Sequence, residues 1–197
     1  EKGDYKAPYL IWALDYIGHK QSSVLDGGFS KWKSEGNLVT QDYPKMVPKQ
    51  YHLPSKLNEE VRATLNEVKE TIGKKNVVLI DVRPLELYTG QAGPWKRKGH
   101  IKDAINHFWG DDLKEDGTWK DQKDLKKIYE NLGATSDKTV IVSCGQGQMS
   151  AHTYLTLKYV LGYPKVKNYD GSFNEWSNIA ELPVESSTGV SLNPENL

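Results

Sequence analysis

The chain has 197 residues, and its 26 lysine and arginine residues balance 26 aspartate and glutamate residues. This neutral balance argues against nucleic acid or an anionic membrane surface as the main partner, because both attract a basic excess. The apolar runs are shorter than the roughly 18 residues that a membrane span needs. Because Cys144 is the single cysteine, an intrachain disulfide and a thiolate metal cluster are excluded, and we expect neither a metal nor a cofactor.

A short sequence pattern occurs twice in the chain. Asp26–Phe29 followed by Trp32 returns as Asp170–Phe173 followed by Trp176, and several further identities fall in the same register. In this register the first residue of the chain corresponds to the residue after Cys144. The first copy therefore lacks everything that precedes that point in the second copy.

The register predicts a fragment of a longer two-domain protein, and a short natural N-terminal extension is the alternative. We expect 1–45 to be the C-terminal part of a first domain, 46–57 a linker, 58–180 a complete catalytic domain and 181–197 a surface tail. A helix and one short strand cannot bury their apolar residues unaided. We therefore expect the missing first-domain segment to be present as a separate nicked chain. The start of the chain is not a signal peptide, which favours the cytoplasm. Export stays open because the native N-terminus would be absent.

Apolar spacing predicts an α/β fold. In chain order it indicates a helix over 9–17, a strand at 24–25, a helix over 64–72, a strand over 77–80, a helix over 121–132, a strand over 140–142, a helix over 150–161 and a strand over 165–169. Thr64 and Glu67 have the spacing of a capping box. The all-apolar runs at 77–80 and 140–142 are typical of parallel strands that are buried on both faces. We therefore expect an open parallel sheet with helices on both faces, plus a partial second copy at the N-terminus.

The segment from Cys144 to Ser150 carries the clearest chemical signal. Cys144 ends a predicted strand, and ligands of open α/β sheets bind at the carboxyl ends of strands. Gly145 and Gly147 allow the backbone to curl so that its N–H groups stabilise an anionic sulfur. We predict that Cys144 is a nucleophile, the alternative being an inert core cysteine. The predicted loop and substrate-binding residues are Gly145, Gln146, Gly147, Gln148, Met149 and Ser150.

This loop resembles the active-site loop of the rhodanese family of sulfurtransferases. Further matching stretches are Leu79–Pro84, Gly99–Ile101 and Asn168–Ser172, and 5–32 resembles the end of the family's non-catalytic first domain. The chain thus resembles a tandem rhodanese of the bacterial thiosulfate sulfurtransferase type. The resemblance implies that sulfur moves from thiosulfate to cyanide or another thiophilic acceptor through a persulfide on Cys144.

Departures from the family pattern leave the sulfur donor open. Loops of the thiosulfate type carry a basic residue directly after the cysteine and often another near the loop end, where this chain has Gly145 and Met149. Mercaptopyruvate sulfurtransferases share the glycine but place an arginine near the position of Thr89. The alternatives are therefore a 3-mercaptopyruvate sulfurtransferase and a weakly active sulfur-carrier or binding module. Arg97 and Lys98 belong to a basic cluster that could bring charge to the mouth of the site, unless that loop is simply solvated.

Several other residues receive supporting or structural roles. Asp81 and Arg83 follow a buried strand, and we expect them to brace the loop rather than to catalyse. Related cysteine phosphatases need an arginine at the position of Ser150, so this chain is not expected to be one.

Aromatic side chains are further candidates for the walls of the site. His152 follows the loop, and lining the pocket and packing half-buried are both open for it. Trp95 could wall the site, whereas core packing is favoured for Trp176 because the repeat contains it twice.

Overall fold

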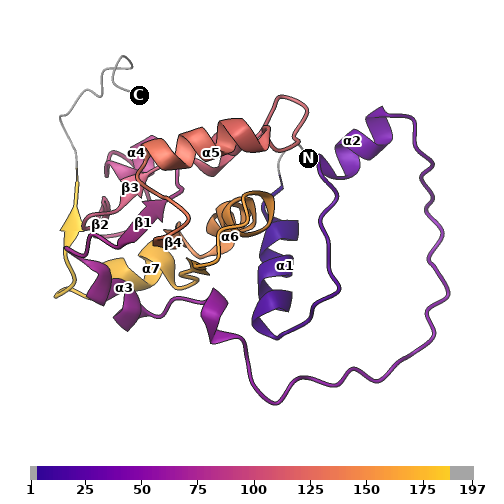
Figure 1. Cartoon of the computed structure of the whole chain (residues 1–197), viewed down its shortest axis with the longest axis horizontal. Coiled ribbons are helices and arrows are strands. Elements are labelled where there is room, and N and C mark those ends of the chain that lie inside the picture. Colours follow the sequence, from indigo (N-terminus) through magenta and orange to yellow (C-terminus); the bar gives the residue numbers. More distant parts are fainter. Residues whose placement is uncertain (1–3, 187–197) are drawn as a thin grey trace.

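The computed structural model describes residues 4–186 and has a parallel four-stranded sheet at its centre (Figure 1). Its strands are β1 (Val77–Asp81), β3 (Ile105–Asn106), β4 (Thr139–Ser143) and β5 (Val166–Asn168), in the order β3-β1-β4-β5. A separate antiparallel pair joins β2 (His100–Ile101) to β6 (Val184–Glu185). The predicted α/β class and parallel sheet are confirmed, and the small antiparallel pair was not predicted.

Seven α-helices are found in the described residues. They are α1 (Lys6–Tyr16), α2 (Gly28–Ser34), α3 (Leu65–Thr71), α4 (Leu85–Tyr88), α5 (Gln122–Asn131), α6 (Gln148–Leu155) and α7 (Ser172–Ser177). Short 3₁₀ turns cover Glu59–Val61 and Trp109–Asp112, and a π-helical turn covers Thr156–Val160. In this part of the chain no helix combines the length and the apolar character that crossing a membrane requires.

Two sequence predictions about helices can be compared directly with the structure. The capping box of α3 forms: the Glu67 amide donates to Thr64 Oγ1 at 3.3 Å, and the Thr64 amide donates to Glu67 Oε2 at 2.8 Å. The helix expected over 150–161 begins two residues earlier, at Gln148, and turns π-helical from Thr156. Gln148 can begin the helix because Gly147 precedes it in the left-handed region, at φ 77°.

Alternate residues of the central strands face two separate apolar cores. Val78 and Ile80 of β1 lie in one core with residues of α5 and α6, whereas Leu79 lies in the other with residues of α3 and α7. This alternation follows from the period of two in a strand. The helices accordingly cover both faces of the sheet, as the apolar runs predicted.

The N-terminal segment packs against the sheet domain through α1. Trp12 of α1 is buried, and its indole Nε1 donates to the carbonyl of Val61 at 3.0 Å. Asp15 Oδ2 accepts hydrogen bonds from the hydroxyls of Tyr154, at 3.1 Å, and Tyr159, at 2.6 Å. Helix α1 therefore contributes to the core on the α6 side of the sheet.

The strand predicted at Val24–Leu25 is wrong. The sheet in residues 4–186 ends at β3 and β5, and neither strand pairs with these residues. Leu25 is 54% exposed. Without a neighbouring edge to supply ladder hydrogen bonds, this apolar pair stays irregular.

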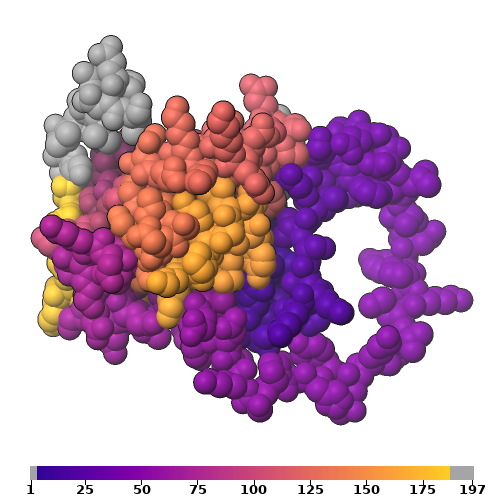
Figure 2. Space-filling view, viewed as in Figure 1, coloured from indigo at the N-terminus to yellow at the C-terminus, as the bar shows by residue number. Residues whose placement is uncertain are grey.

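The segment 38–57 is exposed and contains neither helix nor strand. Figure 2 shows it looping away from α1 with an open space between them. It includes the predicted linker 46–57. At the other end of the chain, the predicted tail begins with β6 inside the described residues, and 187–197 lies outside them.

Candidate active site

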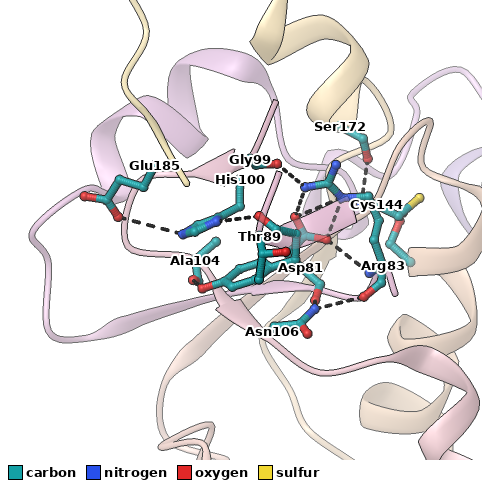
Figure 3. A network of polar contacts seen from close by, with 12 residues as sticks. Asp81, Arg83, Thr89, Gly99, His100, Ala104, Asn106, Cys144, Ser172 and Glu185 are labelled. Carbon is teal, nitrogen blue, oxygen red and sulfur yellow. Dashed lines mark hydrogen bonds and ion pairs between the residues drawn. The ribbon is translucent and has the colours of Figure 1, made fainter. Parts of the chain in front are cut away.

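Cys144 lies directly after β4, at the carboxyl edge of the parallel sheet (Figure 3). The residue is only 2% exposed. Its amide donates to Ser172 Oγ at 3.0 Å, and that hydroxyl donates to the carbonyl of Tyr169 at 2.6 Å. The loops after β4 and β5 are thus joined directly at the cysteine.

The conformation of the loop depends on Gly147. A Cβ atom built at this position would lie 2.5 Å from Asp170 Cα and 2.7 Å from the Asp170 carbonyl oxygen. Both atoms belong to the backbone, so the clash could not be relieved by a rotamer change. The sequence prediction assigned Gly147 to a tight loop, and the close approach of 168–172 gives the physical reason.

The carbonyl groups of the loop are turned toward α7. The carbonyl oxygen of Cys144 accepts from the Phe173 amide at 3.0 Å, and that of Gly145 accepts from the Asn174 amide at 3.0 Å. In a planar trans peptide the N–H group points opposite to the carbonyl. The amides that follow these two carbonyls therefore point away from α7, and the carbonyl dipoles that would repel an anionic sulfur are directed elsewhere.

Ser150 contacts the sulfur from beneath the loop. Its hydroxyl lies 3.6 Å from Cys144 Sγ and 2.7 Å from Asn168 Oδ1, while Asn168 Nδ2 donates to the Gly147 carbonyl at 3.0 Å. Ser150 and Asn168 are fully buried. In residues 4–186 this hydroxyl, rather than a loop amide, provides the hydrogen bond that reaches Sγ. One hydroxyl proton can serve either the sulfur or Asn168, so the serine can respond to the charge on sulfur.

A buried ion pair lies near the cysteine (Figure 3). Arg83 Nη2 lies 2.5 Å from Asp81 Oδ2, and Arg83 Nε lies 2.9 Å from Asp81 Oδ1. Arg83 Nη2 also donates to the Gly99 carbonyl at 2.7 Å. The guanidinium carbon lies 5.0 Å from the ring centroid of Trp95 and 4.3 Å from that of Phe173. The two residues pair, as expected, and the pair ties Gly99 to β1. That the pair also braces the cysteine loop stays a prediction.

A pocket of about 290 Å³ opens over Cys144. Besides the cysteine, its lining residues are Tyr5, Pro94, Trp95, Gly145, Gln146, Gln148, Met149 and Asn174. Gly145, Gln146, Gln148 and Met149 were predicted from the loop, whereas Gly147 and Ser150 are not among the lining residues.

The sequence did not identify Tyr5, Asn168 and Asn174 as site residues. Tyr5 comes from the start of α1, and no local pattern marks it. Asn168 and Asn174 flank the repeated motif at 170–173, which was the one signal that could have indicated them.

The basic cluster does not reach this pocket. Arg97 donates to the carbonyl of Ile179 at 2.5 Å and to the carbonyl of Leu182, so its guanidinium is fixed after α7. Lys98 is exposed, and neither residue lines the pocket. Of the two alternatives for the cluster, charge at the mouth of the pocket is not what the structure shows, and the pocket lining drawn from the described residues contains no charged side chain.

Of the two roles left open for His152, packing is the one that the structure shows, and the residue is fully rather than half buried. It is 2% exposed, and its ring is stacked on Trp119 at 4.9 Å and tilted against Trp109 at 5.2 Å. It lines a separate cavity of about 170 Å³, next to Pro8 of α1. Trp176 is fully buried in the other core, as expected from its packing role.

Comparison with known proteins gives the family. A model described as "Rhodanese-like domain" matches residues 64–179. The chain belongs to the rhodanese family. The rhodanese match spans α3 to α7 and therefore contains the cysteine loop and the Asp81–Arg83 pair.

Curated relatives extend the match beyond the rhodanese domain. The "Sulfur carrier protein TtuD" of Thermus thermophilus is 37% identical over 93% of this chain and 68% of its own length. A "Putative thiosulfate sulfurtransferase" of Saccharopolyspora erythraea is 35% identical over 91% of this chain and 66% of its own length. The "Thiosulfate sulfurtransferase" of Corynebacterium glutamicum is 31% identical over 94% of this chain and 64% of its own length. The chain thus spans about two thirds of the length of these relatives.

Solved structures of EanB are also similar. The wild-type protein has a TM-score of 0.81 and 26% identity, covering 91% of this chain and 44% of EanB. An EanB variant in complex with ergothioneine has the same TM-score and 28% identity. Another EanB structure carries a persulfide on a cysteine.

Proposed function

We propose that the chain is a sulfurtransferase that moves sulfane sulfur from thiosulfate to cyanide or another thiophilic acceptor. The observation that carries this proposal is the position of Cys144. It lies at the carboxyl end of β4, on the floor of an open pocket, with the adjoining carbonyls turned away from it. The names of the curated relatives support the same class of reaction.

The reaction has two half-steps. The Cys144 thiolate attacks the outer sulfur of thiosulfate, the S–S bond of thiosulfate breaks, and sulfite leaves with the electron pair. The cysteine becomes an anionic persulfide. The acceptor then attacks the outer sulfur of the persulfide, and the Cys144 thiolate is regenerated as thiocyanate leaves. Covalent catalysis of this kind replaces one difficult transfer by two easier ones and gives ping-pong kinetics.

A polar group beside Cys144 suits its anionic thiolate state. The Ser150 hydroxyl at 3.6 Å can turn its proton from Asn168 toward the sulfur. Because the oxygen is already within reach, only this rotation of the hydroxyl proton is needed to stabilise negative charge on Sγ. This contact is made to Sγ and therefore acts on the thiolate state.

A sulfur-carrier role is the second candidate, and one observation favours it. The pocket lining in the described residues has no charged side chain, so a thiosulfate dianion would find no counter-charge there. A carrier would receive its sulfur from another persulfide and pass it on. The relative named "Sulfur carrier protein TtuD" fits this candidate.

The mercaptopyruvate alternative is less well supported. Thr89, near whose position those enzymes have an arginine, is 3% exposed. Its hydroxyl donates to the carbonyl of Leu85 at 2.9 Å, and the residue does not line the pocket.

Replacing the cysteine tests the proposal. Cys144→Ser is expected to abolish thiocyanate formation and the mass increase of one sulfur atom after thiosulfate treatment, because loss of a nucleophile lowers kcat by several orders of magnitude. Intact-protein mass spectrometry and a cyanide assay measure both. Ser143→Ala is the control, because the buried Ser143 Oγ has no hydrogen-bond partner in the described structure and does not line the pocket.

The outcomes separate the two candidates. Persulfide formation from thiosulfate with turnover to thiocyanate supports the enzyme. Persulfide formation from an organic persulfide but not from thiosulfate supports the carrier. Turnover by Cys144→Ser above about one percent of the wild-type rate would contradict both.

A further inference from the structure

Trp95 occupies the space beside Gly145 at the edge of the pocket. A Cβ atom built at Gly145 would lie 3.3 Å from Trp95 Cζ2 and 3.6 Å from Trp95 Cη2. A longer side chain at 145 would have to displace the indole. Glycine at position 145 therefore leaves the room that the Trp95 indole occupies.

The indole of Trp95 is held in a fixed position. Its Nε1 donates to Asn174 Oδ1 at 3.3 Å, and its ring packs edge-on against Phe173 with centroids 5.2 Å apart. The Arg83 guanidinium, already paired with Asp81, lies 5.0 Å from the ring centroid. Trp95 nevertheless remains partly exposed and lines the pocket. The pocket thus has a rigid aromatic wall that needs no rearrangement to receive a ligand.

The other walls are apolar or neutral. Tyr5, Pro94 and Met149 present rings and a thioether, and Gln146 and Gln148 present uncharged amides. Such walls offer hydrogen bonds but no counter-charge, so the lost hydration of a small dianion is offset there less completely than at a charged site. They do favour the burial of a flat apolar body, and aromatic rings gain a further contribution from stacking or edge contacts.

We infer that the pocket selects sulfur donors with a flat, uncharged organic body, which lies against Trp95 while the sulfane sulfur reaches Cys144. Trp95 is then a specificity-determining residue. This inference rests on the proposed function, in that Cys144 must accept sulfane sulfur. It goes further by naming the class of donor and the side chain that recognises it.

Three donors with related chemistry separate the contributions of ring and charge. Benzenethiosulfonate is a monoanion with an aromatic body, methanethiosulfonate is a monoanion with a methyl group, and thiosulfate is a dianion without an organic body. With benzenethiosulfonate, the Cys144 thiolate attacks the terminal sulfur, the S–S bond breaks, and benzenesulfinate leaves with the electron pair. The other two donors react in the same way and release methanesulfinate or sulfite.

The test measures, for each donor, the second-order rate constant of persulfide formation on Cys144 of the full chain by rapid-quench mass spectrometry. Trp95→Ala is expected to lower the rate with benzenethiosulfonate by about three- to tenfold relative to the rate with methanethiosulfonate, the range expected for one lost aromatic contact. Trp95→Phe is expected to keep most of the wild-type ratio. Comparing ratios between variants cancels the intrinsic reactivity of each donor.

A second variant covers the case in which Trp95→Ala does not fold. Trp95→Leu keeps an apolar side chain without a ring, and the same fall in the ratio is expected. If Trp95→Ala or Trp95→Leu lowers the rates with both thiosulfonates equally, Trp95 acts only through packing and the inference is overturned. Absence of persulfide from all three donors in the wild type would instead contradict the proposed function.

Discussion

His152 is a buried histidine whose protonation opposes folding. Burial lowers its pKa from 6.5 to about 4, and the charge of Asp112 offsets this only in part. Its Nδ1 atom has no hydrogen-bond partner in the described structure. Between pH 6.5 and pH 4 the unfolded chain binds a proton that the folded chain does not bind, so the free energy of unfolding falls as the pH falls.

Replacing His152 should remove this pH dependence. Between pH 7 and pH 5 we expect the wild type to lose roughly 2 kcal/mol of stability that His152→Phe does not lose. Phenylalanine keeps the ring that packs between Trp119 and Trp109. Urea denaturation at the two pH values measures the difference. If the free energy of unfolding falls equally in both proteins between pH 7 and pH 5, His152 does not titrate in this range.

The strand–turn–helix arrangement of the cysteine loop could be predicted from local sequence, but the residues that surround the loop could not. Cys144 and Gly147 stand out because a strand, a tight turn and a helix follow one another within a few residues. Tyr5 reaches the pocket from a remote part of the chain, and no local pattern marks it. Asn168 lies beside the repeated motif, but the repeat does not indicate that its amide contacts Gly147. The position of Arg97 was left open, and local sequence could not decide it because its partners are backbone carbonyls, which every residue has.

Helix α1 was predicted from its apolar face, but the surface that it covers was not. The apolar spacing at 9–17 is compatible with packing on a missing domain or on the catalytic domain. The structure shows the second arrangement, with Trp12 stacked between Tyr9 and Tyr16 at 5.5 and 6.1 Å. Periodicity identifies the buried side of a helix but carries no information about its partner.

Trp12 should therefore stabilise the whole catalytic domain. The residue is 4% exposed, so Trp12→Ala removes a large buried ring together with its hydrogen bond to Val61. We expect a loss of about 3–5 kcal/mol in the free energy of unfolding, measured by chemical denaturation. Leu10→Ala on the same helix is the control, since Leu10 is 60% exposed. Equal small losses in both variants would mean that α1 does not fold together with the domain.

The two copies of the repeated motif have different environments in the molecule. Phe173 and Trp176 are fully buried, whereas the equivalent Phe29 and Trp32 are 65% and 40% exposed. The second copy is covered by the sheet, and the first has no comparable cover in the described residues. We propose that a separate chain, of the first-domain type expected from the repeat, covers this surface. Denaturing mass spectrometry of the protein from its native cells would detect that chain as a second species.

Alone, the chain should self-associate through this surface. A double variant with Phe29→Ser and Trp32→Ser is expected to shift the sedimentation profile toward monomer, because exposed apolar patches drive association. Tyr43→Ser with Met46→Ser is the matched control, since these residues are 96% and 82% exposed in the extended segment. If the two double variants sediment alike at every concentration, the Phe29–Trp32 surface does not drive association.

The contact of Asp15 with Tyr154 and Tyr159 sets an alkaline limit on the attachment of α1. Burial, and then the carboxylate itself, raises the pKa of both phenols above the usual value of 10. The contact stabilises the folded chain below pH 10, and its contribution is lost as the pH rises toward the raised values. Once a phenol ionises, two negative charges face each other where a hydrogen bond stood, and attraction becomes repulsion. Strong alkali should therefore weaken the packing of α1 against α6. The ultraviolet absorbance of tyrosinate would show at which pH the two phenols ionise.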